Sequence, residues 1–291
     1  MKNNEQHIVN KDSLLLEYLI NELHINRNKA KTLLKFACVN GNPISKFNYE
    51  LKKGDVLTFN SSPIKTSKGF DLDIIYEDEN FIVINKPAGL LTIASESEKE
   101  KTAYHLVREY VQSKNKHDKL FILHRIDKDT SGVLAFIKNN TKLRDTLQEQ
   151  WNDIVLTRKY YAIVRGRINK KEDTIVNYIH KGMGETVNIS DESDKYAKKA
   201  ITEYKVMKTS GKHTLLDVNI LTGRKNQIRV TFNDLGYPII GDQKYGKIKS
   251  PIKRLGLHAY ELSFKNPVDN KTYTFKTAMP QEFKTIFEAS N

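Results

Sequence analysis

The hydrophobic positions of residues 1–60 predict a small α/β unit in which two short helices are followed by short strands. The segment from Ser13 to Leu23 carries leucines at helical spacings, and a second helix is expected from about Arg27 to Ala37, with Asn26 as its N-cap. Apolar runs around positions 39, 44 and 56–59, separated by Asn-Gly and Lys-Gly-Asp turns, predict the strands.

One face of the second predicted helix is basic, because Arg27, Lys31 and Lys35 follow one another at intervals of four residues. Like charges at this spacing weaken an isolated helix by roughly a few tenths of a kcal/mol per pair. The stripe is explained if a phosphate backbone neutralises it. An ordinary solvated helix face is the alternative interpretation.

Residues 61–70 are polar, with a proline and a glycine, and are expected to link this unit to a second domain at residues 71–291. In the second domain, helices are expected at residues 102–111 and 141–155, and a short one after Arg224. Apolar runs predict a hairpin at residues 74–84 and further strands at residues 121–123, 133–137, 159–164, 200–206, 215–220, 257–264 and 272–275. Many strands with few helices predict an α+β fold with a large mixed or antiparallel sheet.

The net charge of +13 and the sequence pI near 9.4 favour a polyanionic partner such as nucleic acid. A solvated, lysine-rich enzyme surface is the other explanation of this excess. The single cysteine, Cys38, excludes an intramolecular disulfide framework and a cysteine-based zinc cluster. The histidines have no metal-ligand spacing, so no metal site is expected.

The chain also lacks the sequence features of membrane targeting and of cofactor binding. The N-terminal segment has no apolar core of a signal peptide, and no apolar run approaches the roughly 20 residues that span a bilayer. We therefore expect a cytoplasmic protein without a membrane partner. Neither a dinucleotide-binding nor a P-loop glycine motif is present, so no cofactor is expected.

The most distinctive polar segment runs from His124 to Gly132 (HRIDKDTSG), between two predicted strands. Arg125 and Asp127 are two residues apart and would share a face of an extended segment. A carboxylate beside cations stays ionised and, in a partly dry cleft, can act as a nucleophile or a base. A loop held by salt bridges, with a turn before Gly132, is the alternative interpretation.

Two further segments carry side chains that suit such a site. A helix starting at Lys225 would place Arg229 one turn on, where its guanidinium can pair with a carboxylate; alternatively, Arg224, Lys225 and Arg229 coat a solvated helix. Tyr160 and Tyr161 point to opposite faces of their strand. One ring is expected to be buried and the other to stack on a base, with two tyrosines at the edge of the core as the alternative.

Taken in order, these motifs resemble known RNA-modifying proteins. The segment LLLEYLINELHINRNKAKTLLKFACVNGNPISKFNYELKKGDVLTF resembles an S4-type RNA-binding module in its basic helix pair, its V-N-G turn and its K-K-G-D-V strand. Residues 71–264 resemble the RluA-type family of pseudouridine synthases. The matching motifs are DIIYEDENFIVINKPAGLLT, HRIDKDTSG, RKYYAIVRG, LTGRKNQIRV with GYPIIGDQKYG, and LHAYELSF. The resemblance implies a pseudouridine-synthase-like catalytic domain preceded by a small α/β S4-like module.

The resemblance implies an isomerase that cuts the N-glycosidic bond of a uridine in structured RNA, turns the base and rejoins it through carbon 5, without a cofactor. It implies Asp127 as the nucleophile, Arg229 as its ion-pair partner and Tyr160 as the ring against the flipped uracil. Arg125 would fill the space that the extruded base leaves. The residues expected to contact RNA besides Arg125 are Arg27, Lys31, Lys35, Arg224 and Lys225.

Four positions depart from the family pattern. Ile126 occupies a position where the family usually has Leu, Arg158 one where it has Lys, and Asn226 and Thr231 ones where it often has His. The last two are expected to alter RNA contacts while sparing the acid and the arginine. The S4-like module favours large-subunit ribosomal RNA as the substrate, with transfer RNA as the alternative. A monomer is expected.

Two other functions compete with this one. The first is a non-catalytic RNA-binding or ribosome-assembly protein that keeps the fold, which the presence of Asp127, Tyr160 and Arg229 opposes. The second is a hydrolase that uses Asp127 with His124, which needs a positioned base or metal that the spacing does not offer.

Overall fold

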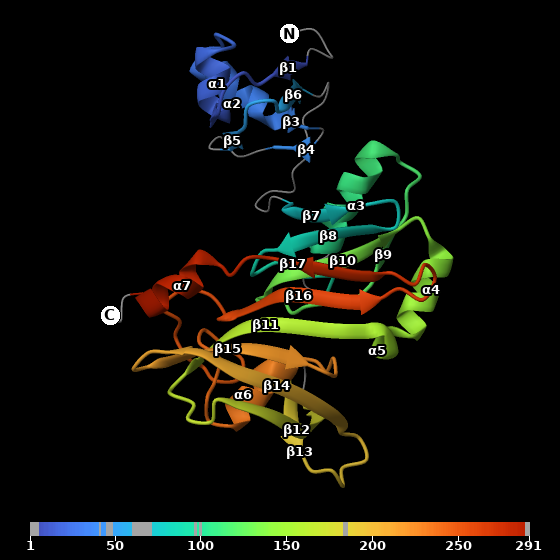
Figure 1. Cartoon of the computed structure of the whole chain (residues 1–291), viewed down its shortest axis with the longest axis vertical. Coiled ribbons are helices and arrows are strands. Elements are labelled where there is room, and N and C mark those ends of the chain that lie inside the picture. The colour runs from blue at the N-terminus through green and yellow to red at the C-terminus, as the bar shows by residue number, and fades with distance from the viewer. Residues whose placement is uncertain are drawn as a thin grey trace. The chain divides into compact units, whose positions relative to one another are not determined.

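The structure, a computed structural model, describes residues 6–40, 42–44, 49–59, 72–95, 98, 101–182 and 186–288. The chain divides into two compact units, Met1–Asp71 and Leu72–Asn291 (Figure 1). The predicted linker at residues 61–70 lies outside the described residues.

The first unit packs two short helices on small sheets. Its helices are α1 (Leu15–Asn21) and α2 (Arg27–Leu33), and its strands are β1 (His7–Ile8), β2 (Ser13–Leu14), β3 (Ala37–Val39), β4 (Asn42–Pro43), β5 (Glu50–Leu51) and β6 (Val56–Phe59). The sheet order is β1-β6-β3-β4, and β2 pairs with β5. Leu15, Leu19, Ala30 and Leu57 are fully buried between the helices and the sheet.

The second helix is shorter than its sequence pattern predicts. Asn26 caps α2 by accepting a hydrogen bond from the Lys29 amide, as expected, but the helix ends at Leu33 and a 3-10 turn (Leu34–Phe36) follows. From Ala37 the chain is a strand whose side chains are all buried against β6. Pairing with β6 thus outweighs the local preference for helix.

The second unit is built on one sheet of 11 strands. Its order is β13-β12-β14-β15-β11-β16-β10-β8-β7, with β17 on β16 and β9 on β10. The strands are β7 (Ile74–Glu77), β8 (Phe81–Lys86), β9 (Leu120–Ile122), β10 (Ser131–Lys138), β11 (Val155–Arg165), β12 (Glu172–Lys181), β13 (Val187–Ser190), β14 (Lys198–Thr209), β15 (His213–Ile220), β16 (Leu257–Lys265) and β17 (Thr272–Lys276). The pairing of β10 with β16 is parallel, whereas the other pairings between these strands are antiparallel. The predicted α+β fold with a large mixed sheet is confirmed.

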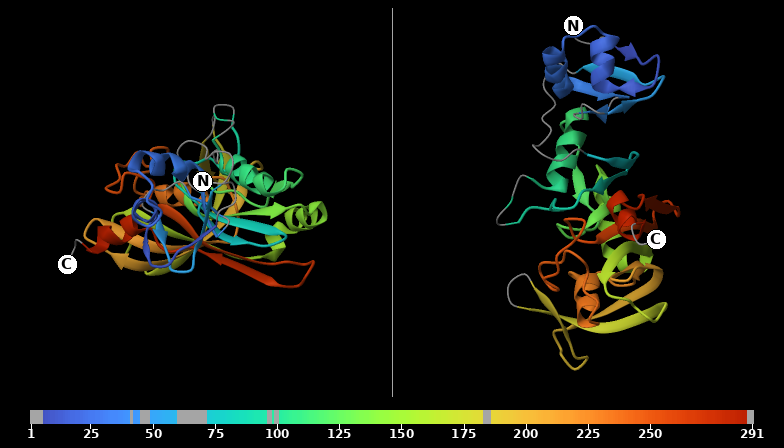
Figure 2. Two further views of the ribbon diagram at one scale, coloured as in Figure 1. Left: turned by 90° about the horizontal axis from the view of Figure 1, so that it is seen from above. Right: turned by 90° about the vertical axis from the view of Figure 1, so that its left-hand side faces the viewer.

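Helices cover both faces of this sheet. They are α3 (Ala103–Lys114), α4 (Thr141–Glu149), α5 (Trp151–Ile154), α6 (Gln227–Asp234) and α7 (Gln281–Glu288). Phe232 of α6 packs with Ala162 and Phe283 of α7 packs with Ile163, so these helices lie on opposite faces of β11. The first residue of β11 follows α5, and α7 lies near its other end (Figures 1 and 2).

In the second unit, two further predicted helix boundaries are wrong. The helix expected at residues 141–155 breaks at Gln150, and Val155 already belongs to β11. The helix expected to start at Lys225 starts at Gln227, because Asn226 before it has the left-handed backbone conformation (φ 52°, ψ 23°). No helix in the described ranges is long and apolar enough to cross a membrane.

Candidate active site

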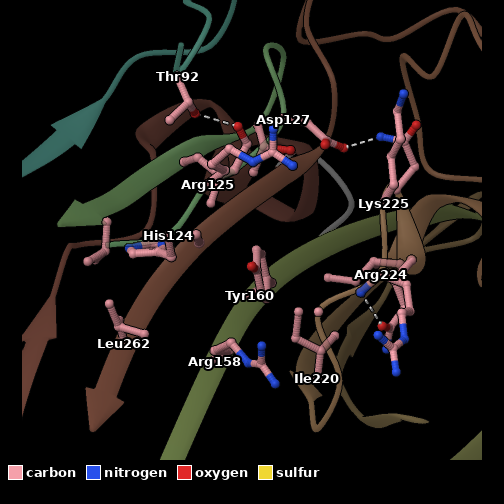
Figure 3. Close-up of a pocket in the computed structure, with 18 of the residues that line it drawn as sticks. Thr92, His124, Arg125, Asp127, Arg158, Tyr160, Ile220, Arg224, Lys225 and Leu262 are labelled. Atoms are coloured by element: carbon pink, nitrogen blue, oxygen red, sulfur yellow. Dashed lines mark hydrogen bonds between the residues drawn. The ribbon is translucent and has the colours of Figure 1, made fainter. Parts of the chain in front are cut away.

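A cleft of about 1320 Å³ lies on the second unit where the loop before β10 meets β11, β16 and the start of α6 (Figure 3). It is larger than the pockets of roughly 300–1000 Å³ that hold most small ligands. The predicted site residues that line it are Arg125, Asp127, Tyr160, Arg224, Lys225 and Arg229. The fold therefore brings together residues from three distant motifs.

The loop that carries Asp127 is held by hydrogen bonds from the last residue of β8 and from the segment that follows β8. Thr92 Oγ1 donates a hydrogen bond of 2.6 Å to the Ile126 carbonyl, and Ile126 itself is buried. The fully buried Lys86 ammonium donates to the Lys128 carbonyl at 2.9 Å and to the carbonyls of residues 87 and 90. Burial lowers the pKa of Lys86 to about 7, against the opposing charges of Asp129 and Asp127. The Asp127 side chain remains partly exposed to the cleft.

The two oxygens of the Asp127 carboxylate have different surroundings. Oδ2 accepts a hydrogen bond of 2.6 Å from Asn226 Nδ2 and lies 3.3 Å from Arg229 Nη1. Oδ1 accepts no hydrogen bond from the part of the chain that the structure describes. One oxygen is thus fixed by two donors, and the other is available to a ligand.

Arg229 is bound more closely to Asp242 than to Asp127. Its Nε and Nη2 bond the two carboxylate oxygens of Asp242 at 2.8 and 2.9 Å, and both residues are buried. Burial opposes the charge of Arg229, but Asp242 and then Asp127 hold its pKa above the ordinary value. Burial likewise opposes the charge of Asp242, yet its bonds to Arg229 hold its pKa below the ordinary value.

Asn226 is the link between Asp127 and the end of the G-D-x-x-Y segment. Its Oδ1 accepts from Tyr245 Oη at 3.0 Å and from Lys244 Nζ at 3.3 Å, which orients its Nδ2 toward Asp127. The expectation that position 226 affects RNA contacts and not the acid is therefore wrong. Thr231 is also placed otherwise than expected: it is fully buried and bonded to Asn177, so its side chain is not accessible to RNA.

The two adjacent tyrosines of β11 separate onto opposite faces. Tyr160 lines the cleft, and burial raises its pKa to about 12. The charge of Arg158 lowers this pKa and the charge of Asp127 raises it. The hydroxyl of Tyr160 is therefore neutral near pH 7. Tyr161 stacks on Tyr260 with ring centroids 4.0 Å apart. Of the two rings, that of Tyr160 is the one presented to the cleft.

The predicted RNA-contacting cations fall on both units. Arg125 and Lys225 are exposed at the cleft, and Arg224 is held by a bond of 2.9 Å from its Nε to the Lys199 carbonyl. Arg27 and Lys31 are exposed on α2 of the first unit. The side chain of Lys35 lies outside the described part of the structure.

His124 accepts a hydrogen bond rather than acting as a base. Its Nε2 accepts from the Ala135 amide at 3.1 Å, and its ring stacks on Trp151. Burial, helped by the charge of Arg158, lowers the pKa of His124 to about 3. Within the described ranges, no group of three or more His, Cys, Asp or Glu side chains is placed to hold a metal ion.

Sequence reasoning assigned no role to Lys86 or Asp242, and it missed the hydrogen bond between Asn226 and Asp127. Lys86 and Asp242 belong to segments (NKPAG and GDQKYG) that carry the family resemblance, so their motif membership was the available signal. Asn226 was noted only as a departure from the family pattern. Its bond to Asp127 depends on a turn that spacing alone does not predict.

Comparison with known proteins identifies the family of the chain. The sequence profile described as RNA pseudouridylate synthase matches residues 80–234. The "Ribosomal large subunit pseudouridine synthase C" of Rickettsia felis is 33% identical over 91% of this chain and 87% of its own length. The "Ribosomal large subunit pseudouridine synthase D" of Borreliella burgdorferi is 36% identical over 72% of this chain and 66% of its own length.

A solved structure shares the fold. The protein described as "Human RNA Pseudouridylate Synthase Domain Containing 4" superposes with a TM-score of 0.60 over 73% of this chain and 90% of its own, at 22% identity. The family profile covers more than half of the chain, and the bacterial relatives are more than 30% identical to it. The chain is an isomerase that belongs to the RluA-type family of RNA pseudouridine synthases.

Proposed function

We propose that this enzyme converts uridine to pseudouridine in large-subunit ribosomal RNA, with Asp127 as the nucleophile. The observation that carries the proposal is the asymmetric binding of the Asp127 carboxylate. Asn226 and Arg229 hold Oδ2, while Oδ1 accepts no bond from the described residues, and Asp127 lines the cleft. A carboxylate held in this way is oriented before the substrate arrives.

The other groups at the cleft act on the flipped nucleotide. Arg229 orients Asp127, since Asp242 leaves its Nη1 directed at Oδ2. The Tyr160 ring packs against the uracil, and its hydroxyl assists removal of the carbon-5 proton; its place in the cleft wall supports this role. The exposed Arg125 occupies the space that the extruded base leaves in the RNA.

The geometry disfavours the competing functions. A hydrolase that pairs Asp127 with His124 would need a basic histidine, but the His124 nitrogen that faces Ala135 is already an acceptor and is held neutral by burial. A binding-only protein would not need the buried Arg229–Asp242 pair behind a partly exposed carboxylate.

Two independent observations favour ribosomal RNA over transfer RNA as the substrate. Relatives from two bacteria are named ribosomal large subunit pseudouridine synthases. The first unit carries exposed Arg27 and Lys31 on a short helix, which suits an S4-like module that grips structured RNA by its phosphates. We further propose that the protein acts as a monomer in the cytoplasm.

Pseudouridine mapping by carbodiimide labelling tests the proposal. A strain that lacks the gene is complemented with the wild-type gene or with Asp127→Ala. Ribosomal sites that vanish on deletion and return only with the wild type support the proposal and identify the uridine. Sites confined to transfer RNA would overturn the ribosomal assignment, and equal rescue by Asp127→Ala would overturn the role of Asp127.

A further inference from the structure

Arg158 of β11 is a buried cation without a counter-ion among the described residues. It is 9% exposed, and within the described ranges its guanidinium makes one hydrogen bond, from Nη2 to the Leu221 carbonyl at 2.8 Å. Its Nε is buried and has no hydrogen-bond partner in that part of the chain. Burial, reinforced by the nearby charge of Arg224, lowers the pKa of Arg158.

Such an arrangement is unfavourable unless a ligand completes it. A buried guanidinium in a structural role is normally paired with a carboxylate, because each unsatisfied buried donor costs about 1–3 kcal/mol and a charged one costs more. The chain also makes room for this side chain: a Cβ added at Gly223 would lie 2.8 Å from Arg158 Nη1. Since Arg158 and Gly223 both line the cleft, the missing acceptor can come from a cleft ligand.

The position of Arg158 relative to Tyr160 indicates which part of the substrate it meets. In Figure 3 the Tyr160 ring lies between Asp127 and Arg158. The charges of both residues act on the Tyr160 hydroxyl. Whether Asp127 attacks the ribose or the base, it lies at the glycosidic bond. A uracil that packs on Tyr160 therefore turns its far edge toward Arg158.

We propose that Arg158 recognises the carbonyl oxygen that lies across the uracil ring from the glycosidic atom. This proposal rests on the proposed function and names how the same cleft reads the base. In uridine the ring is joined through N1, and the group across the ring is O4. In pseudouridine the ring is joined through C5, and the group across the ring is O2. One donor therefore suits the base both before and after it turns.

The same contact makes Arg158 a specificity residue. Arginine offers only donors, so it complements a carbonyl oxygen and opposes the amino group that cytidine carries at position 4. A site built to bond a polar group discriminates strongly against an analogue that lacks it, because the buried donor is then left unpaired. Arg158 thus selects uridine over cytidine in a cleft wide enough to admit either base.

The test compares two target bases in wild type and in Arg158→Met. The probe is a synthetic RNA stem–loop copied from the ribosomal segment that the enzyme modifies, with uridine or 4-thiouridine at the target. Sulfur is a poor acceptor, so the wild type is expected to have a kcat/KM roughly 10- to 100-fold lower for 4-thiouridine. Arg158→Met is expected to lose about the same factor with uridine and to treat the two bases alike. Arg158→Lys should restore part of the discrimination.

The controls separate this proposal from its alternatives. Arg165→Met removes an exposed arginine at the end of the same strand. It should leave the ratio of the kcat/KM values for the two target bases as in the wild type. If Arg158→Met instead weakens the binding of both RNAs equally and lowers the salt dependence of binding, Arg158 contacts a phosphate and the proposal is overturned. Unchanged rates in Arg158→Met overturn it as well. Failure of the wild type to isomerise the uridine stem–loop would contradict the proposed function itself.

Discussion

The carboxylate of Asp242 holds Arg229 by two hydrogen bonds, through Nε and Nη2, and so leaves Nη1 as the nitrogen that reaches Asp127. The pair is buried, whereas Asp127 borders the cleft. Asp242 therefore orients the active-site arginine without lying at the cleft itself.

Replacing Asp242 with Asn should damage both stability and turnover. The substitution leaves Arg229 as a buried cation with one weaker partner, which should lower the free energy of unfolding by about 3 kcal/mol. Misdirection of Arg229 should lower kcat by roughly 100-fold. Urea unfolding and initial rates measure the two effects. Asp234→Asn, at the exposed last residue of α6, the helix that carries Arg229, is the control. Equal behaviour of the two variants would contradict this role of Asp242.

Two substitutions at Asn226 separate its hydrogen bond from its backbone conformation. Both Asn226→Gly and Asn226→Ala remove the bond to Asp127, so both should lower kcat by about 10- to 100-fold. Only alanine is strained at a φ of 52°, so Asn226→Ala should be less stable than Asn226→Gly by about 1 kcal/mol. Kinetics and urea unfolding on both variants check this, and full activity in Asn226→Gly would show that the bond is dispensable.

Gly132 is required by the close approach of β10 to β16. Its φ is 118°, and an added Cβ would lie 2.0 Å from the Ala259 carbonyl oxygen of the parallel partner strand. Gly132→Ala should therefore lower the free energy of unfolding by about 3 kcal/mol, because the backbones must separate. Gly211→Ala, where an added Cβ meets no atom within 4 Å, serves as the control in thermal unfolding. Comparable melting temperatures for the two variants would refute the argument.

The buried His258 should make stability depend on pH. Ser131 Oγ accepts a hydrogen bond from Arg254 Nη2 and lies 2.6 Å from His258 Nδ1, and His258 Nε2 lies 2.7 Å from Thr277 Oγ1. Burial, then Arg254, lowers its pKa to about 4. The unfolded chain binds the proton more tightly, so this stabilisation is complete above about pH 6.5 and is lost as the pH falls toward 4.

Urea unfolding between pH 6.5 and 5 measures this effect. His258→Gln should reduce the change in unfolding free energy over that interval by about 2 kcal/mol relative to the wild type. His117→Gln, at an exposed position, should leave the wild-type change intact. An unaltered pH profile in His258→Gln would mean that His258 does not titrate on unfolding.

Much of the fold followed from periodicity, and the errors have physical causes. Apolar runs predicted nine of the 11 strands of the large sheet, because these strands bury rows of apolar side chains. The strands β12 and β13 were not predicted, since most of their side chains are exposed or half-buried. The helix ends at Leu33 and Gln150 were missed, since strand pairing of the following residues decided them. Such pairing joins segments distant in sequence and leaves no local signal.

The site was predictable in its motifs but not in its contacts. The HRIDKDTSG segment drew attention to Asp127, yet three of its other residues are structural. His124 accepts a hydrogen bond from the Ala135 amide, and Ser131 and Gly132 pair β10 with β16. Asn226 bonds Asp127, which lies 99 positions away along the chain, and Asp242 bonds Arg229, which lies 13 positions away. Sequence spacing cannot show that such residues meet.

The isomerisation rate of purified Asp127→Asn tests the central claim most directly. Asparagine keeps the shape of the side chain but removes its charge and its nucleophilic oxygen. On ribosomal RNA that the wild type modifies, the account predicts that Asp127→Asn forms no pseudouridine while it binds the RNA as tightly as the wild type. Pseudouridine formation at a wild-type rate would contradict the claim that Asp127 is the nucleophile.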